Sequence, residues 1–285
     1  MTACGEKETG NSVNEQFQQF LNSGESSNIE KNIDKISEYV YTPEIISSAG
    51  DLAFEAVQAI AADNALAVLF KITASEDVDI KTVEAGTADD EVLVYKGDIA
   101  AKISGSDFNA FKEENKSSLI DMSGKFLFES IEADETTGTA SYGLRYAVKD
   151  NNVSFEANEK YTIVLYKAGT LSAVCFSTGE IIKSRYEEVS GEVVDAKIRM
   201  SPLAISMMIE YSEYEGKTLE RNIEMKDKDE NSLLETSVSE TEEGTGDGVT
   251  NVYFGTTSKT CISQIYDTDA VASISIFGEE FTIDD

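Results

Sequence analysis

The sequence predicts a mainly β fold, with two Ig-like β-sandwich domains preceded by a short N-terminal helical segment. Apolar residues recur at helical spacing in the first 45 residues, and from about residue 50 they alternate with a period of two. Turn-forming residues then separate short strands at the spacing typical of a sandwich. We expect a tether and short helix over 1–27, a helix over 28–45, a β-sandwich domain with a helical insertion over 46–195, and a smaller Ig-like β-sandwich over 196–285.

Two capping boxes support the N-terminal helices. Ser12 with Glu15 begins the first, whose apolar face holds Val13, Phe17, Phe20 and Leu21. Ser27 with Glu30 begins the second, and Pro43 ends it because the residue before a proline avoids helical backbone angles. Such apolar faces usually pack on their own domain, and partner binding is the alternative.

The segment Phe54–Ile72 predicts a β-hairpin that turns at residues 61–64. Its alternation places four side chains of the first strand on one face, namely Phe54, Ala56, Gln58 and Ile60. A short helix is expected over Ser106–Leu119, with Phe108 and Phe111 directed inward.

The rest of the first β unit is expected to consist of strands. Thr139–Lys149 and Tyr161–Lys167 are predicted to form a hairpin through the turn Asp150-Asn151-Asn152. Further strands are expected at Val92–Tyr95, Phe126–Ile131, Leu171–Phe176 and Glu192–Met200.

Seven short alternating segments follow in the second unit, and the acidic stretch Ser239–Gly248 is expected to be a loop between two of them. The seven predicted strands are Leu203–Tyr211, Leu219–Met225, Ser232–Val238, Val249–Phe254, Cys261–Tyr266, Val271–Ile276 and Glu279–Ile283.

The composition restricts the chemistry. The chain has no histidine and no tryptophan, and 54 acidic against 23 basic residues give a formal net charge of −31. Ser-His-Asp and Cys-His catalysis are thereby excluded, and phosphate binding is disfavoured because it needs clustered lysines and arginines. We therefore expect no enzyme, no nucleic-acid partner and no basic patch for membranes. The acidic surface is typical of solubility through self-repulsion, with collection of Ca²⁺ outside the cell as the alternative.

The first residues, Met1-Thr2-Ala3-Cys4-Gly5, resemble the end of a bacterial lipobox, in which small residues precede a lipid-modified cysteine. The polar stretch Glu6–Ser12 would then be a tether, and a chance Ala-Cys pair is the alternative. On this basis we expect an extracytoplasmic protein that contacts the membrane only through a lipid anchor on Cys4.

Few residues stand out as candidate sites. Asp227, Asp229 and Asn231 are spaced like the start of a calcium loop, but Ser232 and Val238 stand where an EF-hand needs glycine and glutamate, so a hairpin turn is the simpler interpretation. Cysteines 175 and 261 are expected to be free and buried, with a disulfide between them as the alternative. Four tyrosines are candidates for a binding surface, although sandwich cores also use tyrosine: Tyr211, Tyr214, Tyr253 and Tyr266.

The stretch Gly191-Glu192-Val193-Val194, followed by a strand and Ser201-Pro202-Leu203, resembles a domain junction in an extracytoplasmic family of Gram-positive bacteria. Members of that family often lie behind the membrane helix of anti-sigma-factor-like proteins. The hairpin Phe54–Ile72 and the last strand pair are similar as well. The chain departs from the family at Val193, where tryptophan is usual, and in having Cys4 with a tether in place of a cytoplasmic segment and membrane helix. The resemblance implies Ig-like sandwiches outside the membrane and no catalytic residues.

These observations together predict a non-catalytic protein that binds or senses a protein or surface ligand at a bacterial cell surface, as a lipoprotein. The first alternative is the outer sensory domain of an anti-sigma-factor-like membrane regulator. The second is a histidine-free cell-wall or glycan hydrolase, because glycoside hydrolysis needs only two carboxylates. No cofactor is expected apart from the Ca²⁺ alternative.

Overall fold

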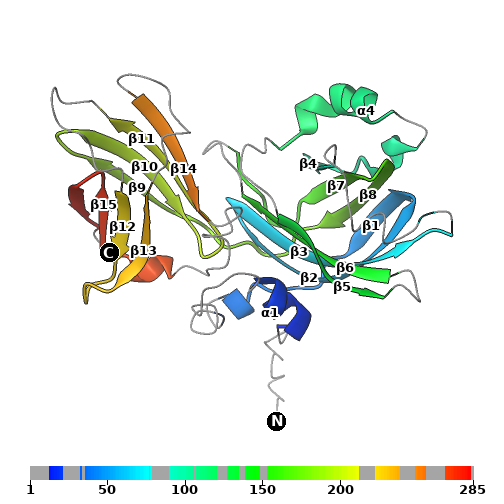
Figure 1. Ribbon diagram of the computed structural model, residues 1–285, viewed down its shortest axis with the longest axis horizontal. Helices are drawn as coiled ribbons and strands as arrows, with labels where there is room; N and C mark the ends of the chain where they lie inside the picture. The colour runs from blue at the N-terminus through cyan, green and yellow to red at the C-terminus, as the bar shows by residue number, and fades with distance from the viewer. Residues whose placement is uncertain are drawn as a thin grey trace, which may run out of the picture.

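The computed structural model describes residues 13–21, 33, 36–76, 78, 90–104, 107–120, 127–134, 139–147, 153–211, 222–237, 248–254 and 267–283. Within these residues the strands form four antiparallel sheets of four strands each, so the prediction of a mainly β, sandwich-like fold is confirmed. The sheets form two lobes, one on each side of the molecule in Figure 1.

The first lobe contains two sheets that lie face to face. One has the strand order β2-β3-β6-β5, with β2 (Leu52–Ala62), β3 (Ala65–Ala74), β5 (Leu127–Asp134) and β6 (Thr139–Ala147). The other has the order β1-β8-β7-β4, with β1 (Ile45–Gly50), β4 (Glu91–Lys96), β7 (Lys160–Lys167) and β8 (Thr170–Ser177).

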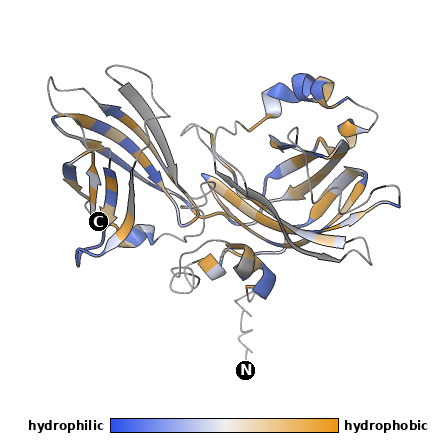
Figure 2. Ribbon diagram, in the orientation of Figure 1, coloured by the Kyte–Doolittle hydropathy of each residue, from blue (hydrophilic) through white to orange (hydrophobic). Residues whose placement is uncertain are grey.

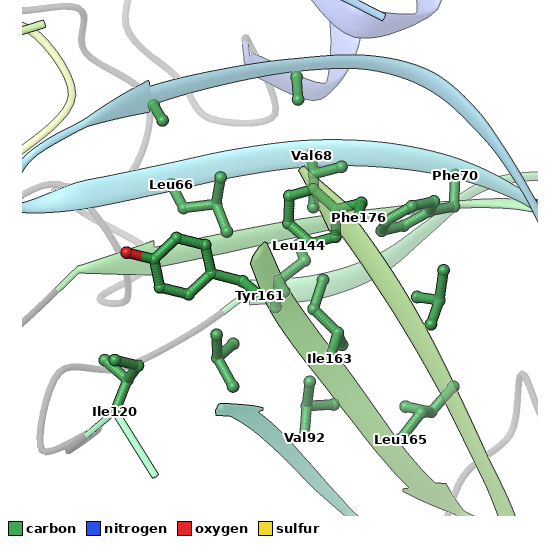
Figure 3. Close-up of a cluster of buried hydrophobic side chains, with 14 of the residues drawn as sticks. Leu66, Val68, Phe70, Val92, Ile120, Leu144, Tyr161, Ile163, Leu165 and Phe176 are labelled. Atoms are coloured by element: carbon green, nitrogen blue, oxygen red, sulfur yellow. The ribbon is translucent and has the colours of Figure 1, made fainter. Parts of the chain in front are cut away.

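A single apolar core lies between these two sheets, as Figure 3 shows. Val68 and Phe70 of β3 meet Ile163 of β7 and Phe176 of β8, and the Phe70 and Phe176 rings make an edge-to-face contact with centroids 6.0 Å apart. Strand β7, with the sequence Lys-Tyr-Thr-Ile-Val-Leu-Tyr-Lys, is rich in β-branched and aromatic residues that favour this extended, buried conformation.

Helical segments cover the outer faces of both sheets. Helix α1 (Glu15–Leu21) lies under β2 and β3 in Figure 1, and its Phe17 and Phe20 belong to a second core with Ile60 and Leu69. Phe20 occupies the space that a side chain on Gly143 of β6 would need, which explains the glycine there.

On the opposite side of the lobe, a third core covers the sheet that contains β7 and β8. It is formed by the 3₁₀ helix η1 (Ala100–Ile103) and helix α4 (Phe108–Asn115), which η2 (Lys116–Ser118) extends. Asp107 caps α4 by accepting from the backbone N–H groups of Asn109 and Ala110. Phe108 and Phe111 are buried, so the predicted helix and its inward face are confirmed.

The second lobe is a sandwich of two further sheets. One has the order β14-β11-β10-β9, with β9 (Arg185–Ser190), β10 (Val194–Met200), β11 (Ile205–Tyr211) and β14 (Gly248–Phe254). The other has the order β13-β12-β15-β16, with β12 (Asn222–Lys226), β13 (Ser232–Ser237), β15 (Ser273–Ile276), β16 (Glu279–Thr282) and the preceding 3₁₀ helix η4 (Thr268–Ala270). The hydropathy of β10 alternates along the strand in Figure 2, because one face meets the apolar core and the other meets solvent.

Two tight hairpins show how local residues fix strand register. Ala168 and Gly169 between β7 and β8 have φ values of 52° and 79°, and Phe277 and Gly278 between β15 and β16 have φ values of 54° and 89°. Positive φ at both central residues is the signature of a type I′ turn, whose twist matches that of the flanking strands. These turns fix the register of their strands, with Lys167 opposite Thr170 in the first hairpin and Ile276 opposite Glu279 in the second.

Several of the predicted elements need correction, beginning near the N-terminus. The helix expected over 28–45 does not reach its predicted end, because Tyr41 exchanges backbone hydrogen bonds with Ala59 (3.0 and 2.8 Å) and β1 begins at Ile45. Thr42 precedes Pro43, which disfavours helical angles there. Helix α1 begins at Glu15, and the Asn14 side chain accepts from the Gln16 N–H at 2.8 Å. The predicted capping residue Ser12 lies outside the described residues.

The hairpin predicted from Thr139–Lys149 and Tyr161–Lys167 is wrong. Strand β6 pairs with β3 and β5, whereas β7 pairs with β4 and β8, so the two strands lie in different sheets. Strand β6 pairs with the preceding strand β5 and β7 pairs with the following strand β8, so the chain passes from one sheet to the other between β6 and β7. The predicted turn at 150–152 lies outside the described residues.

A bulge changes the predicted face of strand β2. The register with β3 shifts between Ala56 and Gln58, so one extra residue enters β2 at Val57. Phe54 and Ala56 therefore face the same core as Ala59 and Ala61, while Ile60 faces helix α1. The predicted single face from Phe54 to Ile60 is thus split in two.

The sheet of the second lobe begins earlier in the chain than residue 196. Strand β9 pairs with β10 from Ser190–Asp195 to Arg185–Met200, and the predicted boundary at 195/196 falls inside β10. The segments predicted at 203–211, 219–225, 232–238, 249–254, 271–276 and 279–283 correspond to β11, β12, β13, β14, β15 and β16, and the one at 261–266 lies outside the described residues.

Candidate functional site

The side of the sheet β9-β10-β11 that faces away from the core carries mostly polar side chains in three rows across the strands, of which two are exposed and the third, with Arg199 and Ser206, is largely buried. The alternating residues of β10 that face the core are Val194, Ala196, Ile198 and Met200. The residues between them face outward, and the strand register aligns them with partners on both sides. The rows are Ser190–Asp195–Glu210, Glu188–Lys197–Met208 and Tyr186–Arg199–Ser206.

The first two rows line an open groove of about 510 Å³, which we call the β9–β11 groove. It is lined by the side chains of Glu188, Ser190, Asp195, Lys197, Met208 and Glu210 together with parts of the neighbouring residues of β9 and β10. Strands β9 to β11 lie on the upper side of the second lobe in Figure 1.

The charges of the groove are unbalanced. Three carboxylates, from Glu188, Asp195 and Glu210, accompany one ammonium group, from Lys197. The Lys197 Nζ lies 4.0 Å from Glu188 Oε1, and the two side chains are 59% and 78% exposed, so this ion pair is weak.

Asp195 and Glu210 stand directly opposite each other on adjacent strands. Like charges at such a position destabilise a sheet. The Ser190 hydroxyl donates a hydrogen bond to Asp195 Oδ1, which satisfies one acceptor but removes no charge. Glu210 makes no ion pair within the described part of the chain. The sheet therefore carries an uncompensated pair of negative charges at the rim of the groove.

The loop at the end of the groove is held by a carboxylate. The backbone N–H groups of Glu192, Val193 and Val194 donate to the two oxygens of Glu279 at 2.9 to 3.2 Å. Gly191 precedes these amides, and the Glu279 carboxylate occupies the space that a Gly191 side chain would need. This contact ties the β9–β10 turn to β16 and so fixes the position of the Ser190–Asp195 row.

The third row lies where the two lobes meet, and we call this contact, centred on Arg199 and Asp63, the joint. Arg199 of β10 is fully buried, and its guanidinium donates to Val153 O and Ser154 Oγ, each at 2.8 Å. Its Nη2 also lies 3.3 Å from Asp63 Oδ1 in the β2–β3 turn. The half-exposed Tyr186 ring covers the guanidinium, with 5.4 Å between its centroid and Cζ.

The turn that begins with Asp63 is itself enclosed by the joint. Asp63 accepts from the backbone N–H of Ser184 at 3.2 Å and from its hydroxyl, and Asn64 Nδ2 donates to Ala204 O at 3.0 Å. The hairpin turn predicted at residues 61–64 therefore lies at the contact between the two lobes and packs against β10 and the residues just before β11.

The calcium-like sequence lies in a hairpin turn between β12 and β13. Asp227 Oδ1 accepts from the backbone N–H groups of Asp229 and Asn231 at 2.8 and 2.9 Å, and the Asn231 amide donates to both of its oxygens. The Asn231 amide contributes most to lowering the pKa of Asp227 below its usual value of 3.8. The carboxylate of Asp227 is thus occupied by its own turn, as the simpler interpretation predicted.

Among the residues that the structure describes, no three histidine, cysteine, aspartate or glutamate side chains gather in a way that could hold a metal ion. Within the same residues no helix is both long and apolar enough to cross a membrane.

The other predicted residues do not gather at the groove. Cys175 is a free, fully buried thiol in β8, and burial raises its pKa to about 11, which makes it unreactive. Tyr211 is buried against Phe277 in the core, with ring centroids 5.6 Å apart. Cys4, Tyr214, Cys261 and Tyr266 lie outside the described residues, and Tyr253 lies in β14.

The groove residues were not singled out from the sequence. The signal was present in the alternation of Glu188, Ser190, Asp195 and Lys197 with apolar residues along two neighbouring strands. Only the register of β9, β10 and β11 shows that the three carboxylates lie on the same face of the sheet, with Asp195 directly opposite Glu210.

Comparison with known proteins adds the following. No protein-family model matches the chain. No curated protein matches it. A solved structure described as the crystal structure of the conserved domain protein from Bacillus anthracis is similar to this chain, with 10% sequence identity, a TM-score of 0.44, and coverage of 92% of this chain and 84% of that chain.

Proposed function

We propose that this chain is a non-catalytic binding protein that acts outside the cytoplasm of a bacterium, is anchored at the cell surface through a lipid on Cys4, and presents the β9–β11 groove to a partner. The observation that carries the binding role is the groove itself. It is an open hollow of about 510 Å³ on a sheet face, with three carboxylates and a single ammonium group, which lies 4.0 Å from the Glu188 carboxylate.

The surroundings of the groove favour recognition over chemistry. Its charged side chains, Glu188, Asp195, Lys197 and Glu210, are exposed, whereas catalytic groups usually lie in sites from which water is excluded. They project from paired strands and not from loops, so their spacing is set by the backbone hydrogen bonds of the sheet. A fixed, polar, solvent-exposed surface suits a partner that is bound and released without reaction.

The placement at the cell surface rests on the sequence. The lipobox-like residues around Cys4 and the polar stretch behind them support a lipid anchor, and a formal net charge of −31 suits a protein that stays in solution above the membrane. Mass spectrometry of the protein isolated from the membranes of its own bacterium should find a diacylglyceryl group on Cys4. An unmodified Cys4 in that material contradicts the anchor and leaves the groove proposal intact.

Photo-crosslinking in living cells tests the binding role. A benzoylphenylalanine at Glu188, which is 78% exposed in the groove, should form an adduct with a partner. The matched control carries the same residue at Glu113, which is exposed on α4 far from the groove. Absence of an adduct at Glu188, or the same adducts at both positions, contradicts the proposal. Turnover of a muropeptide or glycan panel by the purified protein contradicts its non-catalytic part.

A further inference from the structure

We infer that the two lobes and helix α1 form one rigid body, in which Arg199 locks the angle between the lobes. This rigidity goes beyond the proposed function and does not depend on what the β9–β11 groove binds. Polar contacts between lobes usually permit relative motion, so the rigidity has to come from the way the contacts are arranged. Three contacts matter: the segment that connects the lobes, the turn between β10 and β11, and the buried ion pair between these two.

The segment between β8 and β9, which connects the lobes, is bonded to the first lobe along its second half. The Ile182 N–H donates to Ala61 O at 2.9 Å, and Ile182 O accepts from the Asp63 N–H at 3.0 Å. Ser184, the last residue before β9, donates through its backbone N–H to Asp63 Oδ1 at 3.2 Å. The chain is therefore held by the first lobe up to the residue at which the second lobe begins.

The turn between β10 and β11, residues 201–204, is a second attachment to the first lobe. Ser201 Oγ accepts from the N–H groups of Leu203 and Ala204, each at 3.2 Å, and this bonding fixes the shape of the turn. Ala204 O accepts from Asn64 Nδ2 at 3.0 Å. Leu203 and Ala204 also belong to the apolar core that contains the buried residues of helix α1, so α1 and both lobes share one core.

The two attachments hold the same end of the second lobe. Arg185, the first residue of β9, pairs with Met200, the last residue of β10, from which the turn follows. Arg199 is fully buried beside that end and is bonded to the first lobe through Asp63 at 3.3 Å and Val153 O at 2.8 Å. A small rotation about either attachment would separate Arg199 from Asp63 before water reaches them and would leave a buried charge without its partner.

The rigid body also fixes the groove relative to the N-terminus. Helix α1 packs in the same core as the β10–β11 turn, and β10 and β11 carry two sides of the groove. In the lipid-anchored protein proposed above, the groove would therefore keep one orientation relative to the helix that follows the tether.

Distances between spin labels test the rigid body in the purified full chain. Labels on non-natural amino acids at Glu113 of α4 and Glu188 of β9 report on the two lobes, and a pair at Glu15 and Glu188 reports on α1; all three positions are exposed. Pulsed electron paramagnetic resonance should give both pairs one distance distribution, as narrow as that of Glu188 and Glu280 within the second lobe. A broader or divided distribution overturns the rigid body.

Arg199→Met tests the lock. It should at least double the width of the Glu113–Glu188 distribution, while the Glu188–Glu280 distribution stays narrow. The matched control Glu279→Gln weakens the second lobe at the β9–β10 turn, the opposite end of these strands, and should leave the Glu113–Glu188 width unchanged. An unchanged width in Arg199→Met, or equal broadening in the control, overturns the role of Arg199.

A second variant keeps the test decisive if Arg199→Met also broadens the pair within the second lobe, which would mean that this lobe has lost its fold. Asp63→Asn preserves the size of the side chain and the hydrogen bonds of Arg199 to Val153 and Ser154. It should broaden the distribution between the lobes and leave the distribution within the second lobe narrow; a width equal to that of the unaltered protein overturns the lock. Failure of the rigid body leaves the proposed binding role intact, because the labels report geometry and not binding.

Discussion

Arg199 of β10 and Asp63 of the β2–β3 turn form a buried ion pair across the joint between the two lobes, with 3.3 Å between Nη2 and Oδ1 and side chains that are 1% and 9% exposed. The two residues are far apart in sequence, and Asp63 belongs to the first lobe whereas Arg199 belongs to the second. Arg199 also donates to Val153 O and Ser154 Oγ, and Asp63 accepts from the backbone N–H and the hydroxyl of Ser184, whereas the buried Arg199 Nε has no hydrogen-bond partner among the described residues. A hydrogen-bonded pair of this kind is difficult to break without leaving one charge alone inside the protein.

Substitution of Arg199 tests the strength of the joint. Arg199→Met should lower the free energy of unfolding by about 3–5 kcal/mol, because Asp63 then keeps a buried charge without its partner. Asp63→Asn/Arg199→Met should lose less than the sum of the two single variants. Urea unfolding of all four proteins measures this coupling, and strictly additive losses would show that the two side chains stabilise the joint independently.

The Glu279 carboxylate should stabilise the second lobe through the β9–β10 turn. Glu279→Gln replaces a charged acceptor of three backbone N–H groups by a neutral amide and should lower the free energy of unfolding by roughly 1–2 kcal/mol. Glu280→Gln, one residue away and exposed, is the control and should have little effect. Hydrogen exchange of the Glu192, Val193 and Val194 amides should quicken only in the first variant, and unchanged exchange in both contradicts the role of Glu279.

Tyrosine at position 95 should give a less stable protein than phenylalanine would. Its ring is buried against Phe111 at 5.5 Å between centroids, and its hydroxyl has no hydrogen-bond partner within the described part of the chain. Because a buried hydroxyl without a partner carries its full desolvation penalty, Tyr95→Phe should raise the free energy of unfolding by about 1 kcal/mol. A loss of stability would instead show that the hydroxyl is satisfied.

Two tyrosines whose hydroxyls are enclosed, Tyr41 and Tyr95, should make the fold sensitive to alkali. Burial raises the pKa of Tyr41 and of Tyr95 from 10.0 to about 12. The unfolded chain therefore releases these protons first, so their contribution is complete below pH 10 and is lost as the pH rises through about 12. A tyrosinate absorbance titration should show late-ionising groups, and Tyr41→Phe/Tyr95→Phe should flatten the fall in stability between these pH values. A titration in which all tyrosines ionise near pH 10 contradicts this prediction.

Asp227 should make the stability of the fold depend on pH in the acid range. Its lowered pKa means that the folded state binds the proton less tightly than the unfolded state, so the contribution of Asp227 is present above pH 3.8 and is lost as the pH falls through the lower folded value. NMR titration of the Asp227 carboxyl should give a midpoint below 3.8. Millimolar Ca²⁺ should leave the melting temperature unchanged, since the carboxylate is occupied by Asn231; a rise that Asp227→Asn abolishes would restore the calcium interpretation.

Local patterns were sufficient where a structural element depends on its own residues. The hairpin of β2 and β3 followed from period-two alternation on both sides of a polar turn, and helix α4 followed from Phe108 and Phe111 at helical spacing. The Asp227 turn followed from the ability of an aspartate to accept from the backbone N–H groups that come after it. Each of these interactions closes within a few residues or across one turn.

The same local patterns do not predict contacts between segments that are distant in the sequence. The partners of β6 and β7, the bulge at Val57 and the glycine opposite Phe20 depend on which sheets lie face to face. The β9–β11 groove belongs to the same class, because Asp195 and Glu210 become neighbours only through strand register. The mainly β character, the excess of negative charge and the absence of histidine chemistry are already visible in the amino-acid sequence, because they depend on composition and on the period of apolar residues. Which carboxylates share a surface and which arginine is buried depends on sheet pairing, because pairing brings together residues that no local spacing relates.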